Sequence, residues 1–188
     1  MRAIIVRHGD TFRHDEEPRR IGARTDLPLV ESGRAQAQRL AASFAGMAID
    51  ACLTSSLRRT RETAAIVAPG LRARPTDWLR EIDHGPDEGL PETAVRARIG
   101  AAALLAWETR AVAPTDWIVD AAARLKAWQT FFATAHGTIL LVTSNGAARF
   151  ALLALGMPPA KLRTGAYGEI VDGRLIAWDV RPDEQSRC

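Results

Sequence analysis

Arg7 and His8 are the first residues able to do chemistry, and they stand between an apolar run at residues 3–6 and Gly9. A guanidinium binds phosphate oxygens, an imidazole attacks phosphorus, and a glycine lets the backbone turn sharply. The apolar run is typical of a strand buried on both faces, and ligand sites of open α/β sheets lie at the carboxyl ends of such strands. The pattern therefore favours a phosphoryl-binding site, although two surface residues after a strand would give the same sequence.

A second group of cations follows the hydroxyl cluster at residues 54–56, which is typical of a helix start. The first turn of a helix favours an anion because its backbone N–H groups are exposed and the helix dipole is positive there. Position thus favours Arg58 over Arg59 and Arg61 as an anion ligand. The alternative is a solvated helix face on which none of the three binds a ligand.

Several carboxylates lie in residues 77–89, after the strand-like pair Trp78 and Leu79. One of them, Glu81 among the candidates, could donate a proton to a leaving group. They could equally be charges of a surface loop.

The elements that must position these residues follow from hydrophobic periodicity and from breaker residues. We expect a loop at 10–26, a helix from about 32 with apolar residues at 37, 40, 41 and 44, a strand at 51–53, a helix to about 68, two helices within 91–135 broken near 113–114, a strand at 138–142, a helix to about 155, and a hairpin around Asp172 and Gly173. Trp107, Trp117 and Trp128 are expected to pack in the interior. His136 precedes the strand at 138–142 and Asn145 follows it, so the two cannot share one site.

Length and composition bound the remaining possibilities. A chain of 188 residues that is 47% hydrophobic fits one α/β domain spanning 1–188. The net charge is only +3 and the arginines are scattered, which argues against a nucleic-acid partner. No signal peptide or membrane span is recognisable, so a cytoplasmic protein is expected. Cys52 and Cys188 are not expected to form a disulfide, and the polar tail from Arg181 is expected to be loose.

Four segments occur together in one order: Arg7-His8-Gly9-Asp10-Thr11, residues 24–29 (RTDLPL), residues 55–64 (SSLRRTRETA), and residues 79–82 (LREI) followed by Glu88-Gly89. Over residues 2 to about 155 the chain resembles the histidine phosphatase superfamily, the phosphoglycerate-mutase-like enzymes. The resemblance implies a three-layer α/β/α sandwich with a mostly parallel sheet, to which the predicted C-terminal hairpin adds, and a lid insertion at about 85–117. It also implies that His8 is phosphorylated during turnover, that Arg7 and Arg58 clamp the phosphate, and that Glu81 is the proton donor. His14 stands where many relatives place a phosphate-binding asparagine.

One departure from the family pattern concerns the chemistry directly. Relatives carry Ser-His-Gly after the strand at 138–142, whereas this chain has Ser144-Asn145-Gly146. An imidazolium offers a charge and a donor, but Asn145 offers only a neutral N–H group to the phosphoryl. Removal of one preorganised donor typically lowers kcat by about 10²–10³. Arg149 lies one helical turn beyond Asn145, which raises the hypothesis that it supplies the missing charge.

The resemblance implies a phosphoryl-transfer enzyme that needs no metal or cofactor and that acts on a small phosphorylated substrate or phosphate ion. A phosphomonoesterase is the favoured expectation. The alternatives are an isomerase of the phosphoglycerate-mutase type and a weakened pseudoenzyme that binds phosphate esters. A metal site built from His8, Asp10, His14 and Asp15 is disfavoured, because the neighbouring arginines would repel a cation.

Overall fold

Within residues 1–182, which the computed structural model describes, six strands form one sheet in the order β3-β2-β4-β1-β5-β6. The parallel part comprises β3 (Arg74–Pro75), β2 (Ala51–Thr54), β4 (Thr138–Thr143) and β1 (Arg2–Arg7). The antiparallel strands β5 (Tyr167–Val171) and β6 (Arg174–Val180) complete it. Their predicted hairpin turns at Asp172 and Gly173 with φ of 47° and 74°, as a type I′ turn requires.

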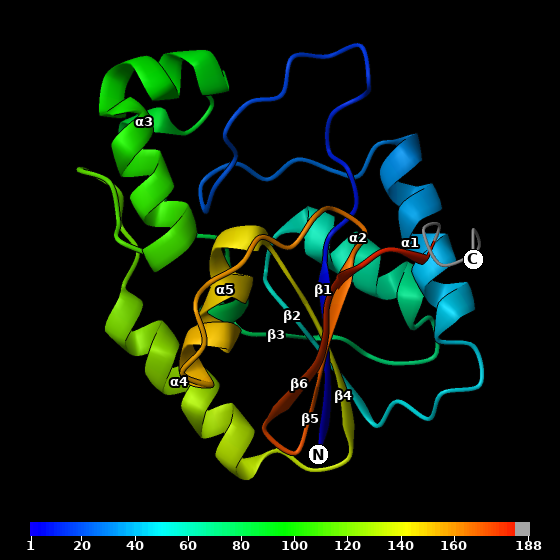
Figure 1. Cartoon of the computed structure of the whole chain (residues 1–188). Coiled ribbons are helices and arrows are strands. Elements are labelled where there is room, and N and C mark those ends of the chain that lie inside the picture. The colour runs from blue at the N-terminus through cyan, green and yellow to red at the C-terminus, as the bar shows by residue number, and fades with distance from the viewer. Residues whose placement is uncertain (183–188) are drawn as a thin grey trace.

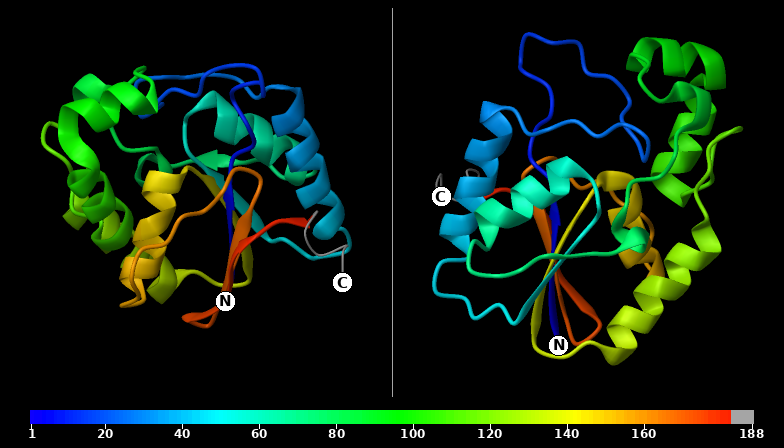
Figure 2. Two further views of the ribbon diagram at one scale, coloured as in Figure 1. Left: turned by 45° about the horizontal axis from the view of Figure 1, so that its top comes forward. Right: turned by 180° about the vertical axis from the view of Figure 1, so that it is seen from behind.

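Helices cover both faces of the sheet (Figures 1 and 2). α1 (Glu31–Ser43) and α2 (Arg58–Val67) lie on one face, and α4 (Ala121–Thr134) and α5 (Asn145–Ala154) lie on the other. The long helix α3 (Glu92–Arg110) stands above α4, beyond the carboxyl ends of the parallel strands. The layers confirm the expected α/β/α sandwich with a mostly parallel sheet.

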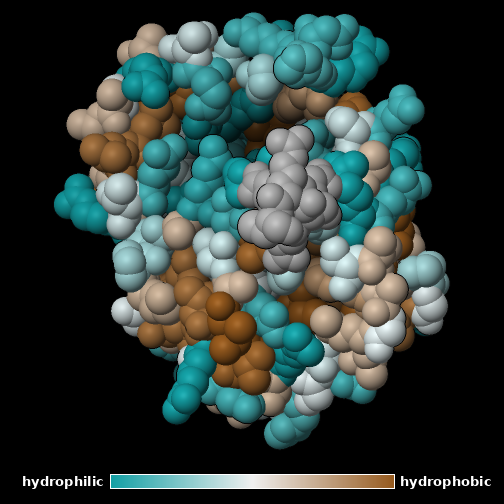
Figure 3. Space-filling view, turned by 45° about the vertical axis from the view of Figure 1, so that its right-hand side comes forward, coloured by the Kyte–Doolittle hydropathy of each residue, from teal (hydrophilic) through white to brown (hydrophobic). Residues whose placement is uncertain are grey.

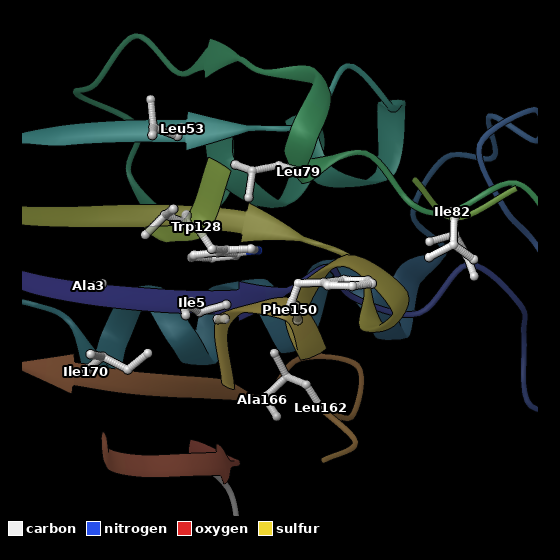
Figure 4. Close-up of a cluster of buried hydrophobic side chains, with 14 of the residues drawn as sticks. Ala3, Ile5, Leu53, Leu79, Ile82, Trp128, Phe150, Leu162, Ala166 and Ile170 are labelled. Carbon is white, nitrogen blue, oxygen red and sulfur yellow. The ribbon is translucent and has the colours of Figure 1, made fainter. Parts of the chain in front are cut away.

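The central strand β1 is buried on both faces, which explains its unbroken apolar run. Ile4 and Val6 pack with the residues of α1 and α2, whereas Ala3 and Ile5 pack with those of α4 and α5. Figure 4 shows the second cluster, in which side chains from β1, β2 and β5 meet Trp128 of α4 and Phe150 of α5. Trp107, Trp117 and Trp128 are all buried, as the sequence predicts.

The helices that follow the neighbouring strands β1 and β4 in the chain lie on opposite faces of the sheet. β1 leads through the loop 8–30 to α1, while β4 leads directly into α5. The two strands are parallel, with Arg7 opposite Thr143. Ligands of open α/β sheets bind at such a switch point, outside the carboxyl ends of the strands. His8 and Asn145 come next to this crevice because each follows one of the two strands.

The segment between β3 and α4 differs from the sequence expectation in one detail and agrees with it in another. Trp78 and Leu79 are not in a strand but in the 3₁₀ turn η1 (Asp77–Leu79), whose carbonyl at Leu79 accepts a hydrogen bond from Thr143 Oγ1 at 2.6 Å. The expected break near 113–114 is confirmed, since α3 ends at Arg110 and α4 begins at Ala121. A second 3₁₀ turn, η2 (Gly85–Asp87), precedes α3.

Residues 183–188 are outside the described part of the chain, so Cys188 and most of the tail expected to be loose lie there. Cys52 is buried and carries a free thiol. In the described residues we find no helix with the length and apolar character that crossing a membrane requires.

Candidate active site

A pocket of about 880 Å³ opens at the carboxyl ends of β1 and β4. Its walls come from residues 7–32, from the segment with Glu81 and His84, from α3, from the first turns of α5, and from residues 161–164. Hydrophilic side chains gather at this end of the molecule, the upper end in Figure 3. The pocket therefore draws on five separate parts of the chain.

His8 lies at the base of this pocket and is 3% exposed. Its Nδ1 is 2.8 Å from the carbonyl oxygen of Gly9, and its Nε2 is 3.2 Å from Nε of Arg59. A carbonyl only accepts and a guanidinium only donates, so Nδ1 carries the proton and Nε2 has the lone pair. The surroundings thus select the neutral tautomer whose Nε2 is the nucleophilic atom.

The electrostatic environment keeps this imidazole neutral. Burial lowers the pKa of His8 well below its usual value, and the charges of Arg59 and Arg7 lower it further. The hydrogen bond to Gly9 opposes this shift only in part. His8 is therefore neutral at neutral pH, and the lone pair on Nε2 accepts the hydrogen bond from Arg59.

Arg59 is the cation in contact with His8, and this corrects the expectation placed on Arg58. Arg59 is fully buried, and its Nη1 and Nη2 donate to the carbonyls of Thr25 and Gly22 at 2.6 and 3.1 Å. The side chain of Arg58 is 53% exposed and donates to Glu62 at 2.6 Å. The two arginines point differently because neighbouring helical residues are about 100° apart around the axis.

The backbone of Leu162 links Arg7 to Asn145. Nη1 of Arg7 donates to the carbonyl of Leu162 at 2.9 Å, and the N–H of Leu162 donates to Oδ1 of Asn145 at 2.8 Å. Because Oδ1 is an acceptor here, the amide nitrogen of Asn145 is directed elsewhere and is available as a donor. Both residues line the pocket, and Nε of Arg7 is buried without a partner among residues 1–182.

Glu81 occupies the other side of the pocket and is 7% exposed. Its carboxylate accepts from the backbone N–H of Ile82 at 2.9 Å and from that of Gly146 at 3.1 Å. Burial raises the pKa of Glu81, but these N–H groups and nearby positive charge outweigh burial and hold the pKa below its usual value. In the free protein Glu81 is thus a carboxylate at neutral pH.

A half-buried arginine of α4 fixes the segment that carries Glu81. Arg124 donates from Nη1 to the carbonyls of Trp78 and Arg80 at 3.2 and 2.6 Å, and from Nη2 to that of Glu81 at 3.4 Å. Within residues 1–182 the segment is not part of the six-stranded sheet, and an isolated bridge joins Asp83 to Ile118. These charge-assisted bonds take the place of a sheet ladder.

His14 lies in the loop 8–30, is exposed, and lines the pocket opening. Its assignment as a phosphate ligand stays a prediction. Asp10 lies on the same loop and accepts from Nε2 of Gln36 at 2.9 Å, which ties the loop to α1. No three His, Cys, Asp or Glu side chains in the described residues gather where they could hold a metal ion, so the rival metal cluster is not formed there.

The sequence profile of the histidine phosphatase superfamily (branch 1) matches residues 3–170. The chain belongs to this superfamily. The matched range contains every site residue described above. It extends beyond the four motifs of the sequence into β5.

The chain covers less than half the length of the curated relatives it matches. A probable phosphoglycerate mutase GpmB of Cronobacter sakazakii is 38% identical over 87 residues, which are 45% of this chain and 40% of the relative. A probable phosphatase of Schizosaccharomyces pombe is 37% identical over 97 residues, which are 48% and 44% of the two chains.

Solved structures resemble the chain over almost its full length. The structure of TTHB049 from Thermus thermophilus is 29% identical with a TM-score of 0.73, and the match covers 95% of this chain and 98% of that one. A mycobacterial glucosyl-3-phosphoglycerate phosphatase is 25% identical with a TM-score of 0.78 and the same coverage. The fold is thus shared across the whole domain.

Sequence reasoning missed two parts of this histidine phosphatase's site. Arg59 could have been found from periodicity, because it stands four residues before Thr63 and so shares the buried face of α2. Arg58 stands four residues before Glu62 and pairs with it. The role of Leu162 could not be predicted from the sequence, because its hydrogen bonds to Arg7 and Asn145 are made by backbone atoms.

Proposed function

We propose that this histidine phosphatase is a phosphomonoesterase that transfers a phosphoryl group from a small phosphorylated metabolite to Nε2 of His8. The observation that carries the proposal is the His8 ring itself: buried, neutral, protonated on Nδ1 and in contact with a guanidinium through Nε2. These are the properties of an activated nitrogen nucleophile. Both relatives and structural neighbours include proteins named as phosphatases.

The first half-reaction forms the bond between Nε2 and phosphorus and breaks the bond between phosphorus and the alcohol oxygen. Arg7 and Arg59 donate to the equatorial phosphoryl oxygens and neutralise their charge. Before the attack, Arg59 exchanges its hydrogen bond to Nε2 for one to the bound phosphoryl group, which frees the lone pair. The amide nitrogen of Asn145 supplies a neutral donor at the same group.

Glu81 donates the proton to the leaving alcohol oxygen. A bound phosphate dianion raises the pKa of a neighbouring carboxylate, which opposes the low pKa of Glu81 in the free protein. In the second half-reaction the Glu81 carboxylate takes a proton from water, the water oxygen attacks phosphorus, and the bond to Nε2 breaks. Inorganic phosphate leaves and His8 is neutral again.

The test is covalent labelling of His8. The protein is mixed with p-nitrophenyl phosphate, quenched, and examined by mass spectrometry for one added phosphoryl group. We expect an acid-labile label on the wild type and none on His8→Gln. A folded wild type that binds phosphate esters but acquires no label, even at high concentration over hours, would identify a pseudoenzyme and overturn the proposal.

Product analysis separates hydrolysis from isomerisation. An isomerase of the phosphoglycerate-mutase type also passes through phosphohistidine, but it returns the phosphoryl group to a substrate hydroxyl. Release of inorganic phosphate in step with substrate loss supports the phosphatase. Formation of an isomeric phosphate ester with little free phosphate would assign the chain to the mutase type.

A further inference from the structure

Arg149 is a pocket-lining cation that the reaction above does not use. It is 2% exposed and belongs to the second turn of α5. Its Nη1 donates to the carbonyl of Trp107 at 2.6 Å, and its Cζ lies 4.2 Å above the ring of that residue. Arg149 therefore links α5 to α3 through neutral groups.

The edge of the Arg149 guanidinium formed by Nε and Nη2 has no hydrogen-bond partner within residues 1–182. Nε of Arg149 is buried and without a hydrogen bond, and no hydrogen bond of Nη2 occurs within residues 1–182. No ion pair in the same range includes Arg149 either. A buried charge without a counter-ion is costly and is usually paired or bound to a ligand. The edge formed by Nε and Nη2 is also the edge that binds a carboxylate through two parallel hydrogen bonds.

Arg149 and the phosphoryl site are held by different parts of the chain. Arg7 and Asn145 both bond to the backbone of Leu162, whereas Arg149 bonds to Trp107 on α3. Arg149 stands four residues after Asn145, so the two share one helix face about 6 Å apart along the axis. The pocket thus offers two separated guanidinium positions on one surface.

The charges around Arg149 indicate which anion fits. Burial lowers the pKa of Arg149 to about 10, the carboxylates of Glu81 and Glu108 oppose that shift, and the charges of Arg20 and Arg7 add to it. Both carboxylates line the same pocket. Their repulsion disfavours a second dianion beside Arg149, whereas a single carboxylate charge balances one guanidinium.

We infer that Arg149 is a specificity-determining residue that binds a carboxylate on the alcohol part of the phosphate ester. The inference rests on the proposed function in that the ester is the substrate. It assigns Arg149 to a group remote from phosphorus, and not to the charge that a histidine at position 145 would have supplied.

The experiment compares matched ligands that differ by one carboxylate and span different lengths. The pairs are phosphoserine with phosphoethanolamine, 4-carboxyphenyl phosphate with phenyl phosphate, and 6-phosphogluconate with glucose 6-phosphate. Affinities are measured by calorimetry in the His8→Gln background, so that no ligand is turned over. Inorganic phosphate serves as the reference for the phosphoryl site.

In at least one pair we expect the carboxylate to improve affinity about tenfold or more, in line with a charge-assisted bidentate pair. Arg149→Met should bring that ratio close to one while inorganic phosphate binds as before, and Arg149→Lys should retain part of the preference. Absence of a preference in every pair before mutation overturns the inference without any need for a folded variant at position 149. An equal loss for all ligands and inorganic phosphate would also overturn it, since Arg149 would then serve the phosphoryl group.

These binding ratios need no turnover. A failure of the proposed function appears in the labelling of His8, and a failure of the inference appears in the ligand pairs. The two results are thus separable.

Discussion

Arg58 and Arg59 are neighbours in the sequence, yet their guanidinium groups lie in different environments. Arg59 is enclosed between His8 and the carbonyls of the loop 8–30, whereas Arg58 forms a half-exposed ion pair with Glu62. An exposed pair of this kind contributes about 0.3–0.5 kcal/mol. Of the two arginines, only the buried Arg59 is therefore placed to take part in chemistry at His8.

We predict that Arg59→Met lowers kcat/KM for p-nitrophenyl phosphate by about 10² or more, because it removes a preorganised donor to the phosphoryl group. Arg58→Met is the matched control and should stay near the wild-type value. Steady-state kinetics on both proteins, with folding checked by circular dichroism, decides the matter. If Arg59→Met does not fold, Arg59→Lys retains the charge but loses the planar fork and should show the same direction of change. Equal losses in the two positions would contradict our assignment.

At the scale of elements, the first turn of α5 and the segment at Glu81 approach closely enough to require a glycine. A Cβ placed on Gly146 would lie 2.1 Å from Oε1 of Glu81. The N–H of the same glycine donates to Oε2. The helix start therefore holds the proposed proton donor both by contact and by a hydrogen bond.

Gly146→Ala should displace the Glu81 carboxylate while leaving α5 intact, since alanine favours a helix over glycine by up to about 1 kcal/mol. We expect turnover of an alkyl ester such as glycerol 2-phosphate to fall by about 10² or more, the usual share of general acid catalysis. Turnover of p-nitrophenyl phosphate should fall much less, because its leaving group needs little protonation. Gly70→Ala, where a Cβ meets open space, is the control for both substrates. Parallel losses with the two esters would argue against Glu81 as the acid.

At the scale of the whole molecule, folding buries two imidazoles in neutral form. Burial is the largest cause in both cases: it lowers the pKa of His84 to about 4 and that of His8 well below its usual value. His84 packs edge-on against Trp117, with ring centroids 4.5 Å apart. A histidine in the unfolded chain has a pKa of about 6.5. Below that pH the two imidazoles bind protons in the unfolded chain but stay neutral in the folded protein.

The free energy of unfolding should therefore be highest above about pH 6.5 and should fall as the pH drops from there towards 4. The slope approaches about 1.4 kcal/mol per pH unit for each buried histidine. His84→Phe removes one such group and should make the slope shallower, which urea unfolding at several pH values measures. A slope in His84→Phe as steep as in the wild type would show that His84 does not contribute.

The sequence by itself determined the elements that depend on local patterns. The apolar run before Arg7 predicts a doubly buried strand, the turn at Asp172 and Gly173 predicts a hairpin, and both are found because they depend on residues a few positions apart. The same local reasoning placed His8 at the end of a central strand. It erred at Trp78 and Leu79, where packing against the core, and not strand pairing, accounts for the apolar residues: Leu79 is fully buried and Trp78 is partly buried.

Only the tertiary structure decided which side chains and backbone groups complete the site. The backbone of Leu162 between Arg7 and Asn145 and the contact of Arg149 with Trp107 both join segments distant in the chain. Motif spacing fixes which residue types are available, but the contacts of α5 with α3 and with Leu162 fix where their polar atoms point. Such contacts depend on packing between elements, which no periodicity along the chain encodes.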